Sequence, residues 1–169
     1  MHLTDLDIGH FDSQSRLTPP LRSQRDRDAI RTALLDGTID AICSDHTPVD
    51  DDSKLLPFSE AEPGATGLEL LLSLALKWAN ETDTPLAQAL AHVTSKPAQV
   101  LGNRVLASCG RIETGGMADL CLVDLDAMWT VSEDTLCSQG KHTPFLGIEL
   151  PGRVLTTIVG GQVVYEAKA

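Results

Sequence analysis

Asp45 is the residue whose type and position most strongly suggest chemistry. It follows residues 38–44, an apolar run with β-branched side chains that predicts a short β-strand between Gly37 and the proline at position 48. In barrels and doubly wound α/β folds, ligands bind at the carboxyl ends of strands, so a carboxylate here is a candidate functional group. The alternative is an Asp that caps the following turn through its own backbone. For an isolated Asp before a proline-containing loop, the residues alone favour the capping interpretation, so a functional role for Asp45 needs independent support.

The elements around Asp45 predict an α/β arrangement. Ser23, with an acidic residue three positions later, predicts the start of a helix that ends at Gly37 and leads into the strand. The polar segment 47–63 is predicted to be a loop. Its acidic run at residues 50–52 indicates a solvated surface, because no EF-hand spacing of oxygen ligands surrounds it.

Further helices are predicted after this loop. Thr66 and Glu69 have the spacing of a capping box that precedes a helix over residues 68–79. A second helix is expected from residue 85, with a threonine cap at position 84 and proline in the first turn, and a third over residues 95–102, closed by glycine.

Beyond residue 110 the pattern becomes β-like. Apolar runs at residues 118–125, 154–159 and 162–165 predict strands, and the glycine pair at 160–161 predicts a hairpin. Two parts, residues 1–105 and 106–169, therefore meet near residue 105. Neither is complete alone, because one strand followed by three helices cannot form a closed parallel sheet.

Composition excludes several classes of function. The net charge of -11 argues against nucleic acid as a partner and gives no reason to expect binding to anionic membranes. No apolar stretch reaches the roughly 18 residues of a membrane span. The four cysteines form no C-x-x-C pair and no secretory signal precedes them, which predicts reduced core cysteines in a cytoplasmic protein.

Several short motifs, taken in order, resemble the C-terminal portion of dihydroorotases in the amidohydrolase superfamily, over essentially the whole chain. They are Pro19-Pro20-Leu21-Arg22, Asp36-Gly37-Thr38-Ile39-Asp40, Ser44-Asp45-His46, Gly67-Leu68-Glu69, Pro97-Ala98, Gly110-Arg111-Ile112, Gly116-Met117-Ala118-Asp119-Leu120, His142-Thr143-Pro144-Phe145 and Gly152-Arg153-Val154. The resemblance implies a C-terminal fragment of a (β/α)8 TIM-type barrel, with its last strand and helices in residues 1–105, followed by a small β-sandwich segment in residues 106–169. A complete barrel takes about 250 residues.

The resemblance also implies a chemistry, the reversible hydrolysis of a cyclic amide that interconverts dihydroorotate and carbamoyl aspartate with the help of zinc. Asp45 matches the family's last-strand aspartate, which binds metal and transfers the proton. A catalytic zinc ion needs about three protein ligands, however, and the family's H-x-H pair is absent from this chain. We therefore expect Asp45 to be a retained half of a site that binds zinc weakly or not at all, and His46 to have a supporting or packing role.

Two side chains depart from the family pattern. Val49 stands where the family has a histidine that holds the substrate carboxylate, and Thr18 stands where bacterial relatives have an asparagine that touches substrate. Losing the charge-assisted contact costs about 1.5–3 kcal/mol. Pro63 and Gly64 still match the pair that reaches the substrate ring through its backbone.

This combination resembles the non-catalytic dihydroorotase-like chains that assemble with the catalytic chain of aspartate carbamoyltransferase. The leading hypothesis is such a scaffolding chain, and the alternative is a fragment of an active zinc dihydroorotase. A third interpretation is an independent small binding domain. Because the predicted strand and the helix over residues 68–79 would lack their barrel neighbours, we expect poor solubility or oligomerisation of this chain instead.

Overall fold

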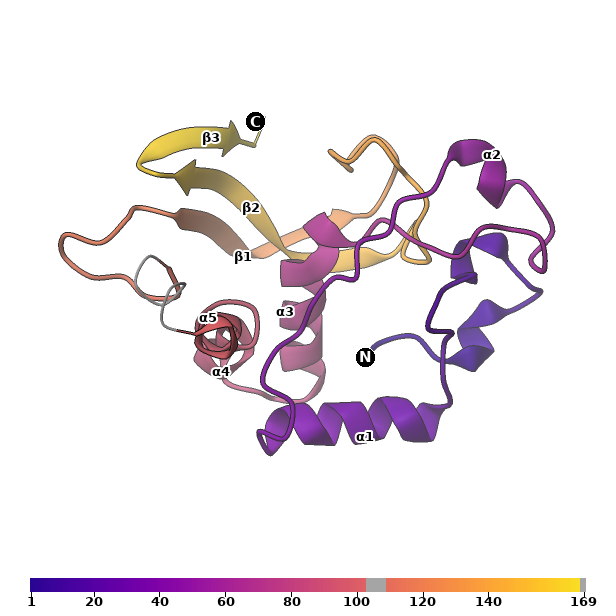
Figure 1. Ribbon diagram of the computed structural model, residues 1–169, viewed down its shortest axis with the longest axis horizontal. Helices are drawn as coiled ribbons and strands as arrows, with labels where there is room; N and C mark the ends of the chain where they lie inside the picture. The colour runs from indigo at the N-terminus through magenta and orange to yellow at the C-terminus, as the bar shows by residue number, and fades with distance from the viewer. Residues whose placement is uncertain (103–108, 168–169) are drawn as a thin grey trace. The chain divides into compact units, whose positions relative to one another are not determined.

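Helices occupy the first part of the chain and strands the last (Figure 1). The computed structural model describes residues 1–102 and 109–167. Contacts divide the chain into two units: unit 1 comprises residues 1–39, 43–71 and 130–149, and unit 2 comprises residues 40–42, 72–129 and 150–169. The boundary predicted near residue 105 lies outside the described residues, so the division at 105 stays a prediction.

Unit 1 contains three short 3-10 helices and two α-helices. They are η1 (Asp5–Ile8), η2 (Ser13–Ser15), α1 (Gln24–Leu35), α2 (Asp51–Lys54) and η3 (Leu68–Leu70). The predicted start of α1 is confirmed: Ser23 Oγ accepts from the Asp26 amide at 3.4 Å, and the Asp26 carboxylate accepts from the Ser23 amide at 3.2 Å. Leu34 is the buried residue of α1, so this helix contributes a narrow face to the core.

The helix predicted after Thr66 begins differently. Gly67 precedes η3, and Thr66 does not cap it, because the Thr66 hydroxyl donates instead to the Gly140 carbonyl at 2.6 Å. The carboxylate of Glu69 accepts from the Cys137 and Ser138 amides rather than closing a capping box. The capping prediction is therefore wrong, because side chains with the right spacing found tertiary partners instead.

Unit 2 holds most of α3 (Leu71–Glu81), together with α4 (Leu86–Ala91), α5 (Ser95–Leu101) and a sheet of strands in the order β1-β2-β3. Trp78 and Leu150 are among its fully buried side chains. The Ser73 hydroxyl and the Trp129 indole both donate to the Gly152 carbonyl, at 2.9 and 3.1 Å, and tie helix to sheet.

The strands are β1 (Leu120–Thr130), β2 (Glu149–Val159) and β3 (Gln162–Glu166). Strands β2 and β3 pair antiparallel around the glycine pair at 160–161, so the predicted hairpin is confirmed. A β-sandwich needs two facing sheets. The described residues form one three-stranded sheet, which accounts for the strands of the predicted sandwich segment but not for a second layer.

The strand predicted over residues 38–44 is not present as a strand. The segment has no regular secondary structure, and its backbone is held by Ile39 N–H to Ala33 O at 2.9 Å and, within unit 2, by Ile42 N–H to His92 O at 3.0 Å. A buried parallel strand needs a strand beside it. Within the described ranges no strand pairs with this segment, so residues 38–44 form no hydrogen-bonded ladder despite their composition.

Two further expectations were tested. The cysteines are free, but Cys43, Cys121 and Cys137 are exposed, so their predicted place in the core is wrong. No helix in the part of the chain that the structure describes is long and apolar enough to cross a bilayer.

Candidate functional site

Asp45 lies in unit 1 at an exposed turn with a left-handed backbone, φ +47°. Asp adopts this conformation more readily than most residues because its short polar side chain bonds locally. The Thr47 hydroxyl donates to the Asp45 carbonyl at 3.1 Å, while the Asp45 carboxylate makes no hydrogen bond to any described residue. Contacts to the backbone therefore stabilise the turn. The carboxylate does not cap it, whereas the capping interpretation required that it should.

His46 anchors this turn to the start of η3. Its Nδ1 accepts from the Gly67 amide at 3.1 Å and the Leu68 amide at 3.2 Å. Because both partners are donors, Nδ1 carries the lone pair and the neutral ring carries its proton on Nε2. The imidazole therefore satisfies amides at a helix start that have no partner inside the helix, as the expected supporting role requires.

Val49 and Gly64 are brought into direct contact. Val49 is 9% exposed, and a Cβ added to Gly64 would lie 2.8 Å from Val49 Cγ1 and would also meet the Thr47 carbonyl oxygen. The Thr47 amide donates to the Ala65 carbonyl at 2.9 Å, and the two residues form an isolated antiparallel bridge. Glycine at position 64 is therefore required by close approach of the two backbones.

The other two predicted positions are exposed. Pro63 precedes Gly64, whose amide donates to the Arg16 carbonyl at 3.0 Å. Thr18 precedes a cis peptide bond to Pro19, and no hydrogen bond within the described residues joins it to Asp45, Val49 or Gly64. Their roles as substrate contacts stay predictions.

The donors around Asp45 do not fit a zinc centre by themselves. Zinc takes about three protein ligands in a catalytic site, and no cluster of three His, Cys, Asp or Glu side chains occurs within residues 1–102 and 109–167.

Two other histidines contact residues away from Asp45. The Nδ1 atom of His142 lies 3.0 Å from Gln14 Nε2, and its Nε2 atom lies 3.3 Å from Asp51 Oδ1. In unit 2 His92 is fully buried with its ring bonded to the Asp40 carbonyl.

Sequence reasoning missed Lys54, which organises the loop after the Asp45 turn. Its side chain is buried, and Nζ donates to the Ser13 and Arg16 carbonyls, both at 3.0 Å. Burial and the nearby Arg16 charge lower the pKa of the Lys54 ammonium. A single lysine within an acidic loop was the only signal in the sequence.

Glu69 is a second residue whose role the sequence did not reveal. Burial raises the pKa of its carboxyl, but hydrogen bonds from Cys137 and Ser138 and the charge of Lys141 outweigh burial and hold the pKa below its ordinary value. Glu69 therefore fastens the segment around residue 137 to η3 as an ionised group.

The chain is similar to known proteins over nearly its whole length. The model of the amidohydrolase family matches residues 10–164. A dihydroorotase from Geobacter metallireducens is 42% identical over 164 residues, which are 97% of this chain and 38% of that protein. A dihydroorotase-like protein from Pseudomonas putida is 42% identical over 163 residues, 96% of this chain and 37% of its own.

Solved structures show the same relationship. The chain matches an L-hydantoinase (dihydropyrimidinase) from Arthrobacter aurescens with a TM-score of 0.88 and 28% identity, covering 99% of this chain and 38% of that one. A D-hydantoinase matches with a TM-score of 0.85 and 26% identity, over 98% of this chain and 37% of its own. The chain thus spans less than two fifths of the relatives it matches. It belongs to the amidohydrolase family.

Proposed function

We propose that this chain is part of a dihydroorotase-like protein of pyrimidine biosynthesis that is non-catalytic and supports assembly with the catalytic chain of aspartate carbamoyltransferase. A cytoplasmic location belongs to the same proposal. The supporting observation is Val49, a buried isopropyl group packed on Gly64 at the position where the family resemblance expects a histidine.

The chemistry of that position supports the proposal in two steps. An isopropyl group neither donates a hydrogen bond nor carries charge, so it cannot hold a substrate carboxylate. Its contact with Gly64 also fills the space at this position. Introducing a larger polar ring into such a packed site costs about 1–3 kcal/mol. Thr18 adds a second altered contact position on the same unit.

The alternative is a fragment of an active zinc dihydroorotase that opens the cyclic amide of dihydroorotate to carbamoyl aspartate. Asp45 favours it, because the residue that would bind metal and transfer the proton is present with an exposed carboxylate. The dihydroorotase relative at 42% identity also favours it. In that case the remaining zinc ligands would be supplied by a longer polypeptide.

Two measurements on the full-length parent protein separate these functions. Hydrolysis of dihydroorotate with added zinc is expected to stay at background, and turnover that Asp45→Asn abolishes would refute the non-catalytic proposal in favour of the alternative. Sedimentation with the aspartate carbamoyltransferase catalytic chain is expected to show a joint complex. An inactive parent that forms no such complex would refute the assembly role.

The control variant is Val49→His. In an inactive scaffold it restores no turnover and lowers stability, because the imidazole must displace the packing against Gly64. In an active enzyme, a gain in kcat/KM for dihydroorotate would show that position 49 contacts the substrate carboxylate. This variant therefore tests whether Val49, in place of the family's histidine, prevents contact with the substrate carboxylate.

A further inference from the structure

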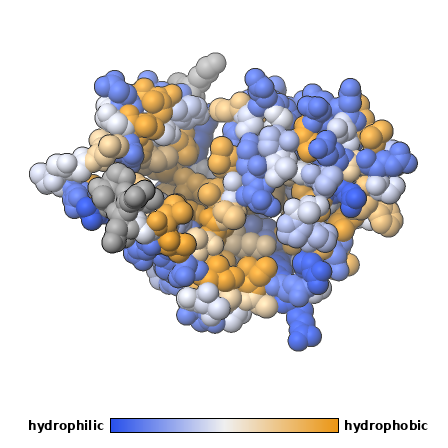
Figure 2. Space-filling view, in the orientation of Figure 1, coloured by the Kyte–Doolittle hydropathy of each residue, from blue (hydrophilic) through white to orange (hydrophobic). Residues whose placement is uncertain are grey.

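Unit 1 exposes a cluster of large apolar side chains beside α2. Phe11 is 72% exposed, Leu55 81% and Leu56 45%. The Phe11 ring meets the Phe58 ring edge-on with centroids 5.7 Å apart, which joins the two segments that carry these residues. We call Phe11, Leu55, Leu56 and Phe58 the aromatic patch. In Figure 2 apolar side chains lie among hydrophilic ones at the edge of the molecule that carries α2.

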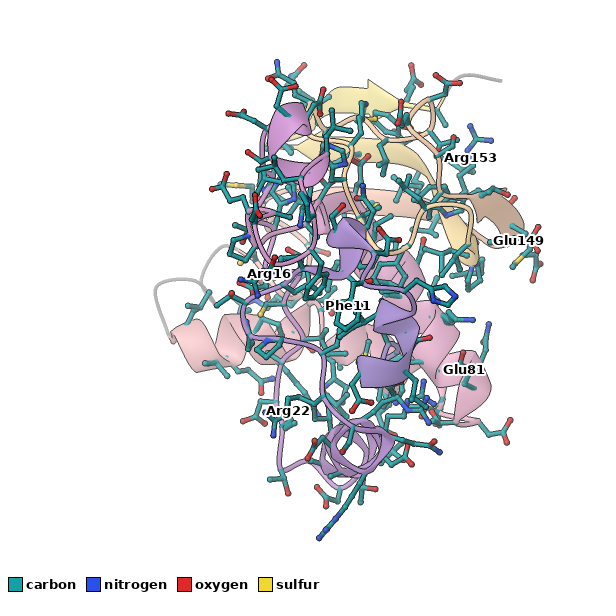
Figure 3. The ribbon with its side chains drawn as sticks, turned by 90° about the vertical axis from the view of Figure 1, so that its right-hand side faces the viewer. Phe11, Arg16, Arg22, Glu81, Glu149 and Arg153 are labelled. Carbon is teal, nitrogen blue, oxygen red and sulfur yellow. The ribbon has the colours of Figure 1, made fainter. Side chains whose placement is uncertain are left out.

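Hydrogen bonds join the segments that carry the patch. The buried Lys54 donates to the carbonyls of Ser13 and Arg16, the Ser13 hydroxyl donates to the Lys54 carbonyl, and the Arg16 guanidinium lies 5.6 Å from the Phe58 ring centroid. Phe11 has φ +61°, a conformation that a bulky residue rarely adopts. Its ring, labelled in Figure 3, is largely exposed to solvent. Aromatic side chains are enriched at protein–protein interfaces.

Acidic side chains are concentrated in the segment that carries three of the patch residues. Residues 50–62 contain Asp50, Asp51, Asp52, Glu60 and Glu62 against one cation, Lys54. Because Lys54 is buried and bonded to carbonyls, its charge is not displayed at the surface. A partner surface that complements this patch has apolar side chains to contact its centre and basic side chains to pair with the acidic residues beside it.

Such a surface is present on α1 and the turn before it. Residues 22–31 contain four of the chain's 13 basic side chains and two acidic ones, whereas the other residues carry nine basic against 22 acidic. In α1 Leu34 is the buried residue, Arg25 is exposed and Leu35 is 43% exposed. Figure 1 shows α1 and α2 at different ends of unit 1, and Figure 3 separates Phe11 from Arg22.

We propose that the aromatic patch of one copy of this chain docks on α1 of a second copy. Phe11 stacks on the guanidinium of Arg25, as Phe58 already does with Arg16, and the acidic residues beside the patch pair with Arg22 and Arg25. The two surfaces differ, so the contact is heterologous and joins copies into a ring or an open chain. This self-association is independent of the assembly proposed with aspartate carbamoyltransferase.

The experiment is sedimentation velocity of the whole chain over a wide range of concentration, at low and high salt. We expect species larger than the monomer that dissociate as salt rises, because the charges beside the patch are screened. Phe11→Asn and Arg25→Glu should each weaken association by about tenfold or more, roughly the effect of one interfacial contact. Asn accepts φ above zero, so the first variant keeps the turn.

A charge swap gives the sharpest result. Asp52→Lys should weaken association, and Arg25→Glu combined with Asp52→Lys should restore it, because the swapped pair attracts again. Ile112→Asn is the matched control, since Ile112 is 88% exposed in unit 2 and outside both surfaces. Circular dichroism checks that each variant is folded. A monomer at every concentration, an unchanged Phe11→Asn variant, or a charge swap without recovery would overturn the proposal.

Discussion

Replacing Glu69 with glutamine should cost stability in a way that depends on pH. The carboxylate accepts from the Cys137 amide at 2.7 Å and the Ser138 amide at 2.9 Å. Hydrogen bonds to a charged group contribute about 1.5–3 kcal/mol each. Glutamine keeps one acceptor oxygen and turns an NH2 group toward the other amide, so we expect a loss of about 2–3 kcal/mol near neutral pH.

The pH dependence follows from the lowered pKa of Glu69. A carboxyl whose folded-state pKa lies below its ordinary value of 4.5 contributes stability above that pH, and the contribution is lost as pH falls through the folded-state pKa. The difference between wild type and Glu69→Gln should therefore be largest near about pH 7 and shrink toward about pH 3. Urea unfolding of both proteins across this range measures it.

A matched control is Glu60→Gln. Glu60 is exposed and its carboxylate has no hydrogen bond among the described residues, so the substitution should change stability by less than about 0.5 kcal/mol. Faster exchange of the Cys137 and Ser138 amides in Glu69→Gln would localise the effect. A Glu69→Gln penalty that is the same at both ends of the pH range would refute the reasoning, because it could not come from the ionised carboxylate.

Three further predictions concern unit 1. Ser23→Ala should lower the free energy of unfolding by about 0.5–2 kcal/mol in urea titrations, because the hydroxyl that accepts from the Asp26 amide and donates to the Asp26 carboxylate is lost; an unchanged midpoint would contradict the cap. Gly64→Ala should cost about 2–4 kcal/mol in the same assay, since its Cβ would meet the Thr47 carbonyl, and wild-type stability would show that the approach is looser than described. Equilibrium dialysis should give zinc binding by this chain that is weak and unaffected by Asp45→Asn, because one carboxylate cannot form a catalytic zinc site; tight binding that the substitution abolishes would reverse that conclusion.

Most elements governed by neighbours in sequence were predicted well, but the predicted cap at Thr84 is wrong, because the N-cap of α4 is Pro85. Ser23 and Asp26 lie three residues apart on one turn, so their mutual capping is encoded locally and α1 begins where expected. Gly102, with φ +85°, ends α5 for the same kind of reason. The hairpin between β2 and β3 follows from two adjacent glycines that both adopt positive φ.

Features governed by distant residues were not predictable in this way. Thr66 and Glu69 have capping-box spacing, yet their side chains bond to Gly140 and to residues 137–138, more than 60 positions away. Residues 38–44 have the composition of a strand. A strand forms only where two segments pair through hydrogen bonds, however, and the composition describes only one of them. Nor does the sequence show that Lys54 is buried, since burial depends on where residues 13–16 lie.

The candidate site shows why a retained loop shape says little about catalysis. The Asp45 turn is fixed by Thr47 Oγ1 on its carbonyl and by His46 Nδ1 on two helix-start amides, and the loop beyond it by the packing of Val49 on Gly64. None of these contacts uses the Asp45 carboxylate. The turn would therefore hold its shape whether or not the carboxylate ever bound a metal ion. What separates an active amidohydrolase from a scaffold is the set of groups that would share the metal with Asp45, and those must come from outside the residues described for this chain.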